Sequence, residues 1–171
     1  NYPSLSGTSV TRDYVEFPSQ MMENWAREPE VIKSFARHYK TGESIPDDLL
    51  AKISEAGTFN EGFGTTEYVA AAHLDMAWHT NEEQISDVNA FEQKALDDLG
   101  LIPEIATRYR STYFGHIFAG GYSSGYYSYL WSEIYSADAF KVFKSSKNVL
   151  NSEVGDRFKN LILKNGNKFN M

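Results

Sequence analysis

Residues 114–139 (FGHIFAGGYSSGYYSYLWSEIYSADA) combine the residue types that a catalytic or binding site needs. They contain His116, the neighbouring Gly120 and Gly121, and tyrosines at positions 122, 126, 127, 129 and 135. Paired glycines let a backbone adopt positive φ or approach a ligand closely. A phenol with a pKa of about 10 stays a neutral hydrogen-bond donor at pH 7. Hydroxyl donors beside such a loop suit a negatively charged oxygen.

The helix expected after this loop has two different faces. Ser123 or Ser124 can cap its N-terminus, which predicts one shared face for Tyr122, Tyr126, Tyr129 and Glu133. The opposite stripe is mostly apolar at helical spacing and is the expected core side: Tyr127, Leu130, Trp131, Ile134. We therefore expect the tyrosine face to be the more exposed. Each tyrosine taken alone is also compatible with a packing role.

The composition is typical of a folded protein with a net negative charge. The 171 residues are 42% hydrophobic and carry a formal net charge of −7, with no basic cluster, which argues against nucleic acid or an anionic membrane as a partner. The absence of cysteine excludes disulfides and thiolate metal sites. No apolar run approaches a membrane span and no signal-peptide pattern is present. A cytoplasmic location is expected, and the periplasm is equally compatible with the cysteine count.

The pattern along the chain is mainly α, without strand-like alternation of useful length. Residues 2–8 should be irregular, and a helix should follow that Thr8 or Thr11 can cap and that Pro18 kinks or truly begins. Its expected apolar stripe contains Val15, Met22 and Trp25 or Ala26. A loop is expected over residues 59–65. Further helices are expected over residues 29–41, 46–56, 67–79, 86–99, 123–146 and 149–164.

Two groups of charged residues lie outside the main stretch. Asp75 and His79 share a helix face, but two ligands are too few for a metal site, so a buried or paired histidine is expected. Arg108 and Arg110 could hold a substrate carboxylate through bidentate hydrogen bonds. They could equally pair with some of the 23 acidic residues.

The main stretch carries a family resemblance. HIFAGGYSSGYYSYLWSE closely resembles the His, Gly-Gly-Tyr and Tyr-Leu-Trp segment of the thimet oligopeptidase and neurolysin family of zinc peptidases. One additional residue separates the histidine from Gly-Gly-Tyr, as in the bacterial peptidyl-dipeptidase (dipeptidyl carboxypeptidase) branch. The resemblance implies that Tyr122 and Tyr129 donate hydrogen bonds to the oxyanion or its neighbouring carbonyl. It also implies substrate contacts for His116, Gly120, Gly121 and Tyr126, with Tyr126 and His116 touching the peptide.

A second motif near the N-terminus carries the same resemblance. SGTSVTRDYVEFPSQMMENW is similar to the family segment whose glutamate is the third zinc ligand, which implies that Glu16 is a metal ligand here. Asp13 and Ser19 would then be supporting or capping groups. By position alone, Glu16, Gln20 and Glu23 are merely a solvated helix face. A carboxylate beside two neutral imidazoles leaves zinc a net positive charge and an open position.

The resemblance implies the C-terminal, multi-helix part of a zincin-type peptidase with little or no β structure. It implies one domain over residues 1–171, made of a third-zinc-ligand segment (1–28), packing helices (29–107), a substrate and oxyanion loop with its helix (108–145) and a terminal helix (146–171). Oligopeptides are the implied substrates, with C-terminal dipeptides as the expected products.

One motif of the family is absent, because the four histidines include no His-Glu-x-x-His pair. We therefore expect this chain to be a fragment that is inactive alone, with two zinc ligands and the general base upstream of Asn1 and the rest of the parent chain as its partner. Alternatives are an endopeptidase of the same family and a non-catalytic helical interaction module. A different hydrolase would need two carboxylates such as Glu16 and Glu133 to converge.

Overall fold

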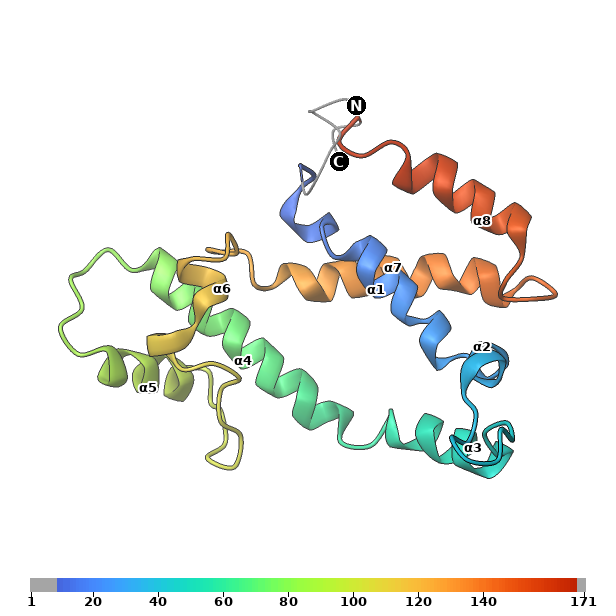
Figure 1. The fold of residues 1–171 in the computed structure, drawn as a ribbon. Coiled ribbons are helices and arrows are strands. Elements are labelled where there is room, and N and C mark those ends of the chain that lie inside the picture. Colours follow the sequence, from blue (N-terminus) through green and yellow to red (C-terminus); the bar gives the residue numbers. More distant parts are fainter. Residues whose placement is uncertain (1–8, 169–171) are drawn as a thin grey trace. The chain divides into compact units, whose positions relative to one another are not determined.

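The computed structural model describes residues 9–168 and confirms a mainly α chain (Figure 1). Its helices are α1 (Phe17–Glu23), α2 (Pro29–Phe35), α3 (Asp47–Ala56), α4 (Glu61–Thr80), α5 (Val88–Asp98), α6 (Gly115–Phe118), α7 (Ser128–Lys144) and α8 (Ser152–Phe158). Shorter turns cover Arg12–Tyr14, Trp25–Arg27 and Ser111–Tyr113, and a π-helical turn covers Lys159–Leu163. In this part of the chain the β pairing is an isolated bridge between Arg37 and Ser44. None of the described helices combines the length and apolarity needed to cross a membrane.

The chain divides into two compact units. Unit 1 contains Asn1–Ala56 and Ser128–Met171, and unit 2 contains Gly57–Tyr127. Helices α1, α2, α3, α7 and α8 therefore belong to unit 1, and α4, α5 and α6 belong to unit 2. The predicted active-site stretch runs across the boundary between them.

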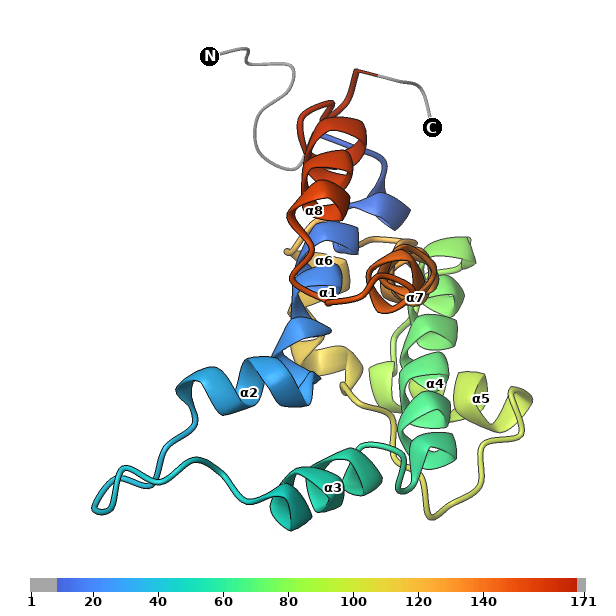
Figure 2. The same cartoon turned by 90° about the vertical axis from the view of Figure 1, so that its right-hand side faces the viewer.

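In unit 1, α1 packs across α7 (Figure 2). The core of this unit joins residues of α1, α7 and α8: Phe17, Met21, Phe140, Phe143 and Phe158. The Trp25 ring meets the Phe143 ring edge to face at a centroid distance of 4.7 Å. Such aromatic pairs contribute about 0.5–1.5 kcal/mol beyond the burial of their area.

The face of α7 that meets α1 is lined by serines. Ser128, Ser132 and Ser136 recur at helical spacing and are all buried. Ser132 Oγ donates to the Asp13 carbonyl oxygen (2.8 Å), and Asn24 Nδ2 donates to Ser136 Oγ (2.9 Å). Small side chains let the two helix backbones approach, and the partner segment satisfies the hydroxyls of Ser132 and Ser136.

The predicted core side of this helix is therefore wrong. Leu130 and Trp131 are 40% and 46% exposed, and Tyr127 and Ile134 are also exposed. Hydrophobicity misassigned the face because the buried side of α7 is the one that packs against α1 and the preceding turn, and this side carries the serines.

In unit 2, α4 is the longest element and carries a buried face with Ala70, Ala71, Leu74 and Asp75. Helix α5 lies beside α4, and the Trp78 ring of α4 packs on the Phe91 ring with centroids 4.1 Å apart. The Asp87 carboxylate caps α5 by accepting from the Ala90 N–H (3.0 Å). Gly100, at φ +75°, ends the helix in the left-handed conformation that favours glycine.

Several predicted boundaries differ from those observed. Pro18 marks the true start of α1. The predicted stripe is wrong at Met22, which is exposed, because the buried residues of α1 are Phe17 and Met21, whereas Trp25 does pack on the core. The helix that begins at Pro29 ends early, at Phe35. The predicted loop over residues 59–65 is mostly wrong because α4 begins at Glu61. The irregular segment predicted over residues 2–8, including the Thr8 cap, lies outside the described residues.

The expected helix start at Ser123 or Ser124 is also wrong. Helix α7 begins at Ser128, and Ser124 adopts a left-handed φ of +53° that no α-helix contains. Tyr122 and Tyr126 therefore precede the helix, and the predicted shared face with Tyr129 does not form. Tyr126 is only 3% exposed, which reverses the predicted order of exposure relative to Leu130 and Trp131.

Candidate active site

Glu16 lies at the turn that leads into α1. Phe17 and Pro18 are the first helical residues, and proline is well suited to this position because an N–H there would have no intrahelical partner. Ser19 Oγ lies 2.8 Å from Glu16 Oε2 and 2.8 Å from the Glu16 carbonyl oxygen. This contact orients the half-buried carboxylate. The local sequence thus holds a carboxylate in a defined orientation at a helix start.

Gln20, one turn after Glu16, connects this segment to α7. Its Nε2 donates to the carbonyl oxygen of Tyr129 at 3.1 Å. The ring of Tyr14, two residues before Glu16, packs edge to face on the Phe17 ring with centroids 5.1 Å apart. Burial raises the pKa of the Tyr14 phenol. The structure therefore places Glu16 and Tyr129 on two neighbouring elements of unit 1.

The neighbouring Gly120 and Gly121 have different structural roles. Gly120 N–H donates to the Gly115 carbonyl oxygen (2.7 Å), and a Cβ at Gly120 would lie 3.0 Å from His116 Cα and 3.1 Å from its carbonyl oxygen. Gly121 has a φ of +80°. The first position requires glycine for close approach and the second for a left-handed turn. The expected positive φ is confirmed at Gly121, whereas Gly120 closely approaches the chain's own backbone, and the approach to a ligand stays a prediction.

An aromatic cluster surrounds the buried Tyr126. Its ring lies 5.6 Å from the His116 ring, 4.9 Å from the Phe114 ring and 5.3 Å from the Tyr68 ring, measured between centroids. The Tyr122 ring is half-buried and meets the His116 ring at 6.0 Å. His116, Tyr122 and Tyr126 are therefore brought together in unit 2.

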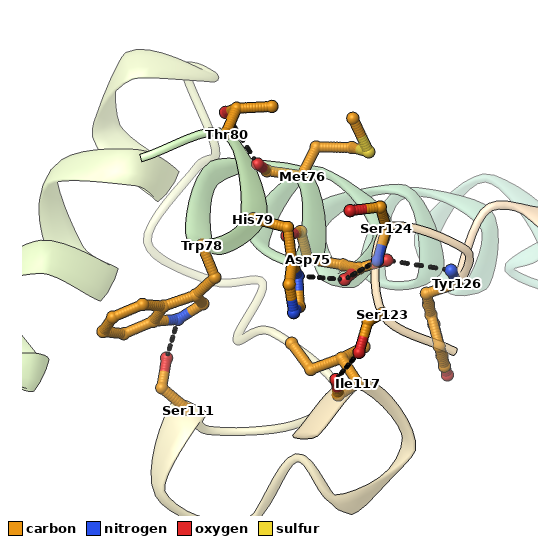
Figure 3. A network of polar contacts seen from close by, with 10 residues as sticks. All are labelled: Asp75, Met76, Trp78, His79, Thr80, Ser111, Ile117, Ser123, Ser124 and Tyr126. Carbon is orange, nitrogen blue, oxygen red and sulfur yellow. Dashed lines mark hydrogen bonds and ion pairs between the residues drawn. The ribbon is translucent and has the colours of Figure 1, made fainter. Parts of the chain in front are cut away.

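Asp75 of α4 anchors the segment that carries these rings (Figure 3). Its carboxylate accepts from the Ser124 N–H and the Tyr126 N–H, both at 2.9 Å, and has no exposed surface. His79 Nδ1 lies 2.8 Å from Asp75 Oδ1. The predicted pairing of this histidine is confirmed. Sequence reasoning missed the loop amides, because they come from a segment about fifty residues away whose conformation was predicted as helix.

The two upstream arginines differ in their contacts. Arg110 Nε forms an ion pair with Glu92 of α5, a buried carboxylate that also accepts from the Ser111 N–H (2.6 Å). Arg108 is exposed. Of the two readings left open for these arginines, pairing with a domain carboxylate is thus the observed one for Arg110.

The candidate residues form two groups that belong to different units. Glu16 and Tyr129 lie in unit 1, whereas His116, Gly120, Gly121, Tyr122 and Tyr126 lie in unit 2. Within residues 9–168, no three His, Asp or Glu side chains converge in a way that could hold a metal ion.

Comparison with known proteins identifies the family. The model of peptidase family M3 matches residues 1–169. The chain belongs to peptidase family M3. This M3 chain is 46% identical over 169 residues to the dipeptidyl carboxypeptidases of Salmonella typhimurium and Escherichia coli, which covers 97% of this chain and 25% of theirs. The resemblance inferred from the two motifs is confirmed.

Other relatives are named oligopeptidases. Oligopeptidase A of Escherichia coli is 38% identical over 170 residues, covering 95% of this M3 chain and 24% of its own length. The organellar oligopeptidase A of Arabidopsis thaliana is 40% identical over 165 residues, covering 91% of this chain. The M3 chain thus spans about a quarter of the length of the curated relatives it matches.

Proposed function

We propose that this chain supplies one zinc ligand and the hydroxyl donors of a family M3 peptidase that releases dipeptides from the C-termini of oligopeptides. The family match over residues 1–169 is the observation that carries the proposal. The relatives at 46% identity are named dipeptidyl carboxypeptidases, which supports this branch over others. Two further zinc ligands and the general base would come from a His-Glu-x-x-His segment outside this sequence, so the chain alone would be inactive.

The residues present fit one ligand of a zinc site. Glu16 offers a carboxylate whose Oε2 is hydrogen-bonded by Ser19, and ligating carboxylates are commonly oriented by such outer hydrogen bonds. Zinc bound there would lower the pKa of its water and polarise the scissile carbonyl. Ser19 would hold the carboxylate in its ligating orientation, and the Gln20 bond to Tyr129 would keep the ligand segment beside α7.

The tyrosines would act on the substrate. Tyr129 and Tyr122 would donate hydrogen bonds to the oxygen on which negative charge develops, a contact worth about 3–4 kcal/mol of transition-state stabilisation in other enzymes. His116 and Tyr126 would form the wall against which the peptide lies, on the loop that Gly120 and Gly121 shape.

The alternative within the same family is an endopeptidase. It is favoured by the relatives named oligopeptidase A, at 38% and 40% identity. The two activities differ in one requirement: a peptidyl-dipeptidase must read the free carboxylate at the end of its substrate, whereas an endopeptidase need not.

The test uses the full-length peptidase that contains this chain and two matched peptides, one with a free C-terminus and one amidated. Peptidyl-dipeptidase action predicts dipeptide release from the free acid and little cleavage of the amide. An endopeptidase would cleave both peptides at similar rates. Chelation should abolish the activity and added zinc should restore it.

A non-catalytic helical interaction module is the remaining rival. It predicts that neither peptide is cleaved under any metal condition and that Tyr129→Phe changes nothing measurable. The same assay therefore separates all three readings, because cleavage of the free acid alone, cleavage of both peptides and cleavage of neither are distinct outcomes.

A further inference from the structure

We infer that Asp75 is the positioning residue of the substrate loop: its buried carboxylate fixes residues 122–126 through two backbone amides and so sets where Tyr122 and Tyr126 lie. The inference rests on the proposed function for its consequences in catalysis. Its structural part is independent of that function, because it concerns how one helix holds one loop.

The Asp75 carboxylate is fully buried, so its negative charge needs stabilising contacts from the protein. Asp75 has no exposed surface, and an ionised carboxylate removed from water is costly unless hydrogen bonds and a partner stabilise it. Here Oδ1 accepts from the Ser124 N–H and Oδ2 accepts from the Tyr126 N–H, each at 2.9 Å. One carboxylate thus holds two amides that are two residues apart.

His79 completes the arrangement from one turn further along α4. Its Nδ1 lies 2.8 Å from Asp75 Oδ1 and 2.9 Å from the Asp75 carbonyl oxygen. Because both neighbours are acceptors, Nδ1 carries the proton and donates. The histidine therefore keeps the carboxylate facing the loop and does not compete for it.

The loop conformation needs such an anchor. Ser124 has a φ of +53°, which is unfavourable for a residue other than glycine and persists where surrounding contacts hold it. Its N–H is one of the two amides bonded to Asp75. Removing the carboxylate would leave this strained residue free to relax, and the relaxation would move its neighbours at positions 122–126.

Both backbone groups of Tyr126 are bonded to α4. Asp75 accepts from its N–H, and the Tyr68 hydroxyl donates to its carbonyl oxygen at 2.5 Å. Tyr68 and Asp75 are seven residues apart and so share one face of the helix. The ring of Tyr126 then packs against His116, and His116 meets Tyr122. Asp75 thus acts on the proposed substrate groups through Tyr126.

The test is Asp75→Asn in the full-length peptidase. Asparagine keeps the shape of aspartate but replaces one carboxylate oxygen with an NH₂ group. The remaining oxygen should stay with the Ser124 N–H and His79 Nδ1, so the Tyr126 N–H loses its acceptor. We expect faster amide hydrogen exchange in peptides spanning residues 122–127. We also expect kcat to fall and KM to rise, lowering kcat/KM about ten- to a hundredfold.

Glu92→Gln is the matched control, because Glu92 is also a buried carboxylate of unit 2 that accepts from a backbone amide. It should lower thermal stability without accelerating exchange at residues 122–127. Adding Ser124→Gly to Asp75→Asn should restore part of kcat/KM, since glycine adopts the left-handed φ without strain. A role in general stability alone would not produce this rescue.

The inference is overturned if Asp75→Asn leaves loop exchange unchanged and kcat/KM within about twofold. It is also overturned if Asp75→Asn and Glu92→Gln act alike in every measurement. Should Asp75→Asn not fold, Asp75→Glu keeps the charge but displaces the carboxylate by one methylene from the two loop amides, and unchanged loop exchange in that variant overturns the inference. Failure of the proposed function differs from these outcomes, because the unmodified enzyme would then cleave no peptide while the exchange result still stands.

Discussion

The two groups of candidate residues are held by different means. Glu16 and Tyr129 lie on or beside regular helices of unit 1, where a serine stripe on α7 packs against α1. His116 lies in the short helix α6 of unit 2, and Tyr122 and Tyr126 lie in the irregular segment that follows it, where two glycines, a left-handed serine and a buried aspartate define the path. The first group is positioned by helix packing and the second by individual backbone contacts.

This difference matches the roles that we propose. A metal ligand must keep one geometry, which regular helices provide, whereas groups that contact a peptide must admit it and release it, which a loop anchored at a few points allows. Changes in the first group should therefore remove an activity outright. Changes in the second should lower substrate binding and turnover together.

The largest effect is expected for Glu16→Ala in the full-length peptidase. Loss of a group that only orients a ligand already weakens metal affinity by up to about a hundredfold, so loss of the ligand itself should weaken zinc affinity by more than that. Peptide cleavage should be lost with the metal. Metal content after dialysis and peptide hydrolysis measure the two effects. Glu23→Ala, at the exposed end of α1, is the control and should retain both. Full zinc content in Glu16→Ala would show that the ligand is misassigned.

Tyr129→Phe tests the other member of the first group. If the hydroxyl donates to the oxyanion, kcat should fall by about a hundredfold while KM changes little, because the contact forms only as charge develops. Tyr135→Phe, on the same helix, is the control and should keep kcat within a few-fold. A raised KM with unchanged kcat would instead assign Tyr129 to ground-state binding.

Gly120→Ala addresses the loop. A Cβ would lie 3.0 Å from His116 Cα, so the backbone must shift, at a cost of about 1–3 kcal/mol typical of overpacking. Faster hydrogen exchange at residues 115–126 and a lower kcat/KM should result. Gly64→Ala in α4, where nothing lies within 4 Å of the added Cβ, should instead stabilise by about 0.5–1 kcal/mol. Equal effects at both positions would remove the close approach as an explanation.

The sequence predicted the helical class, and the structure confirms it. The role of Pro18 at the start of α1 was predictable because it depends on a local rule. The buried face of α7 was not predictable in this way, because Ser132 is buried in contact with the distant Arg12–Tyr14 turn, where the Asp13 carbonyl oxygen accepts from its hydroxyl. Asp75 was recognised only as the partner of His79, since its loop amides come from distant residues. The roles proposed for Glu16 and Tyr129 are untested by the fold alone.

The smallest effect separates two serines of the same stripe. Ser132 Oγ donates to the Asp13 carbonyl oxygen, whereas the buried Ser128 Oγ has no hydrogen-bond partner among the described residues. Ser132→Ala should therefore lose a hydrogen bond worth about 1 kcal/mol, and Ser128→Ala should remove an unsatisfied hydroxyl and be neutral or stabilising. Ser132 lies inside α7 and Ser128 is its first residue, so Ser132→Ala alone gains interior helix propensity and the difference between the variants is a lower bound on the contribution of the hydrogen bond. The opening free energy of α1 and α7 amides, from native-state hydrogen exchange, measures it, and an equal response of the two variants would mean that the stripe acts through size alone.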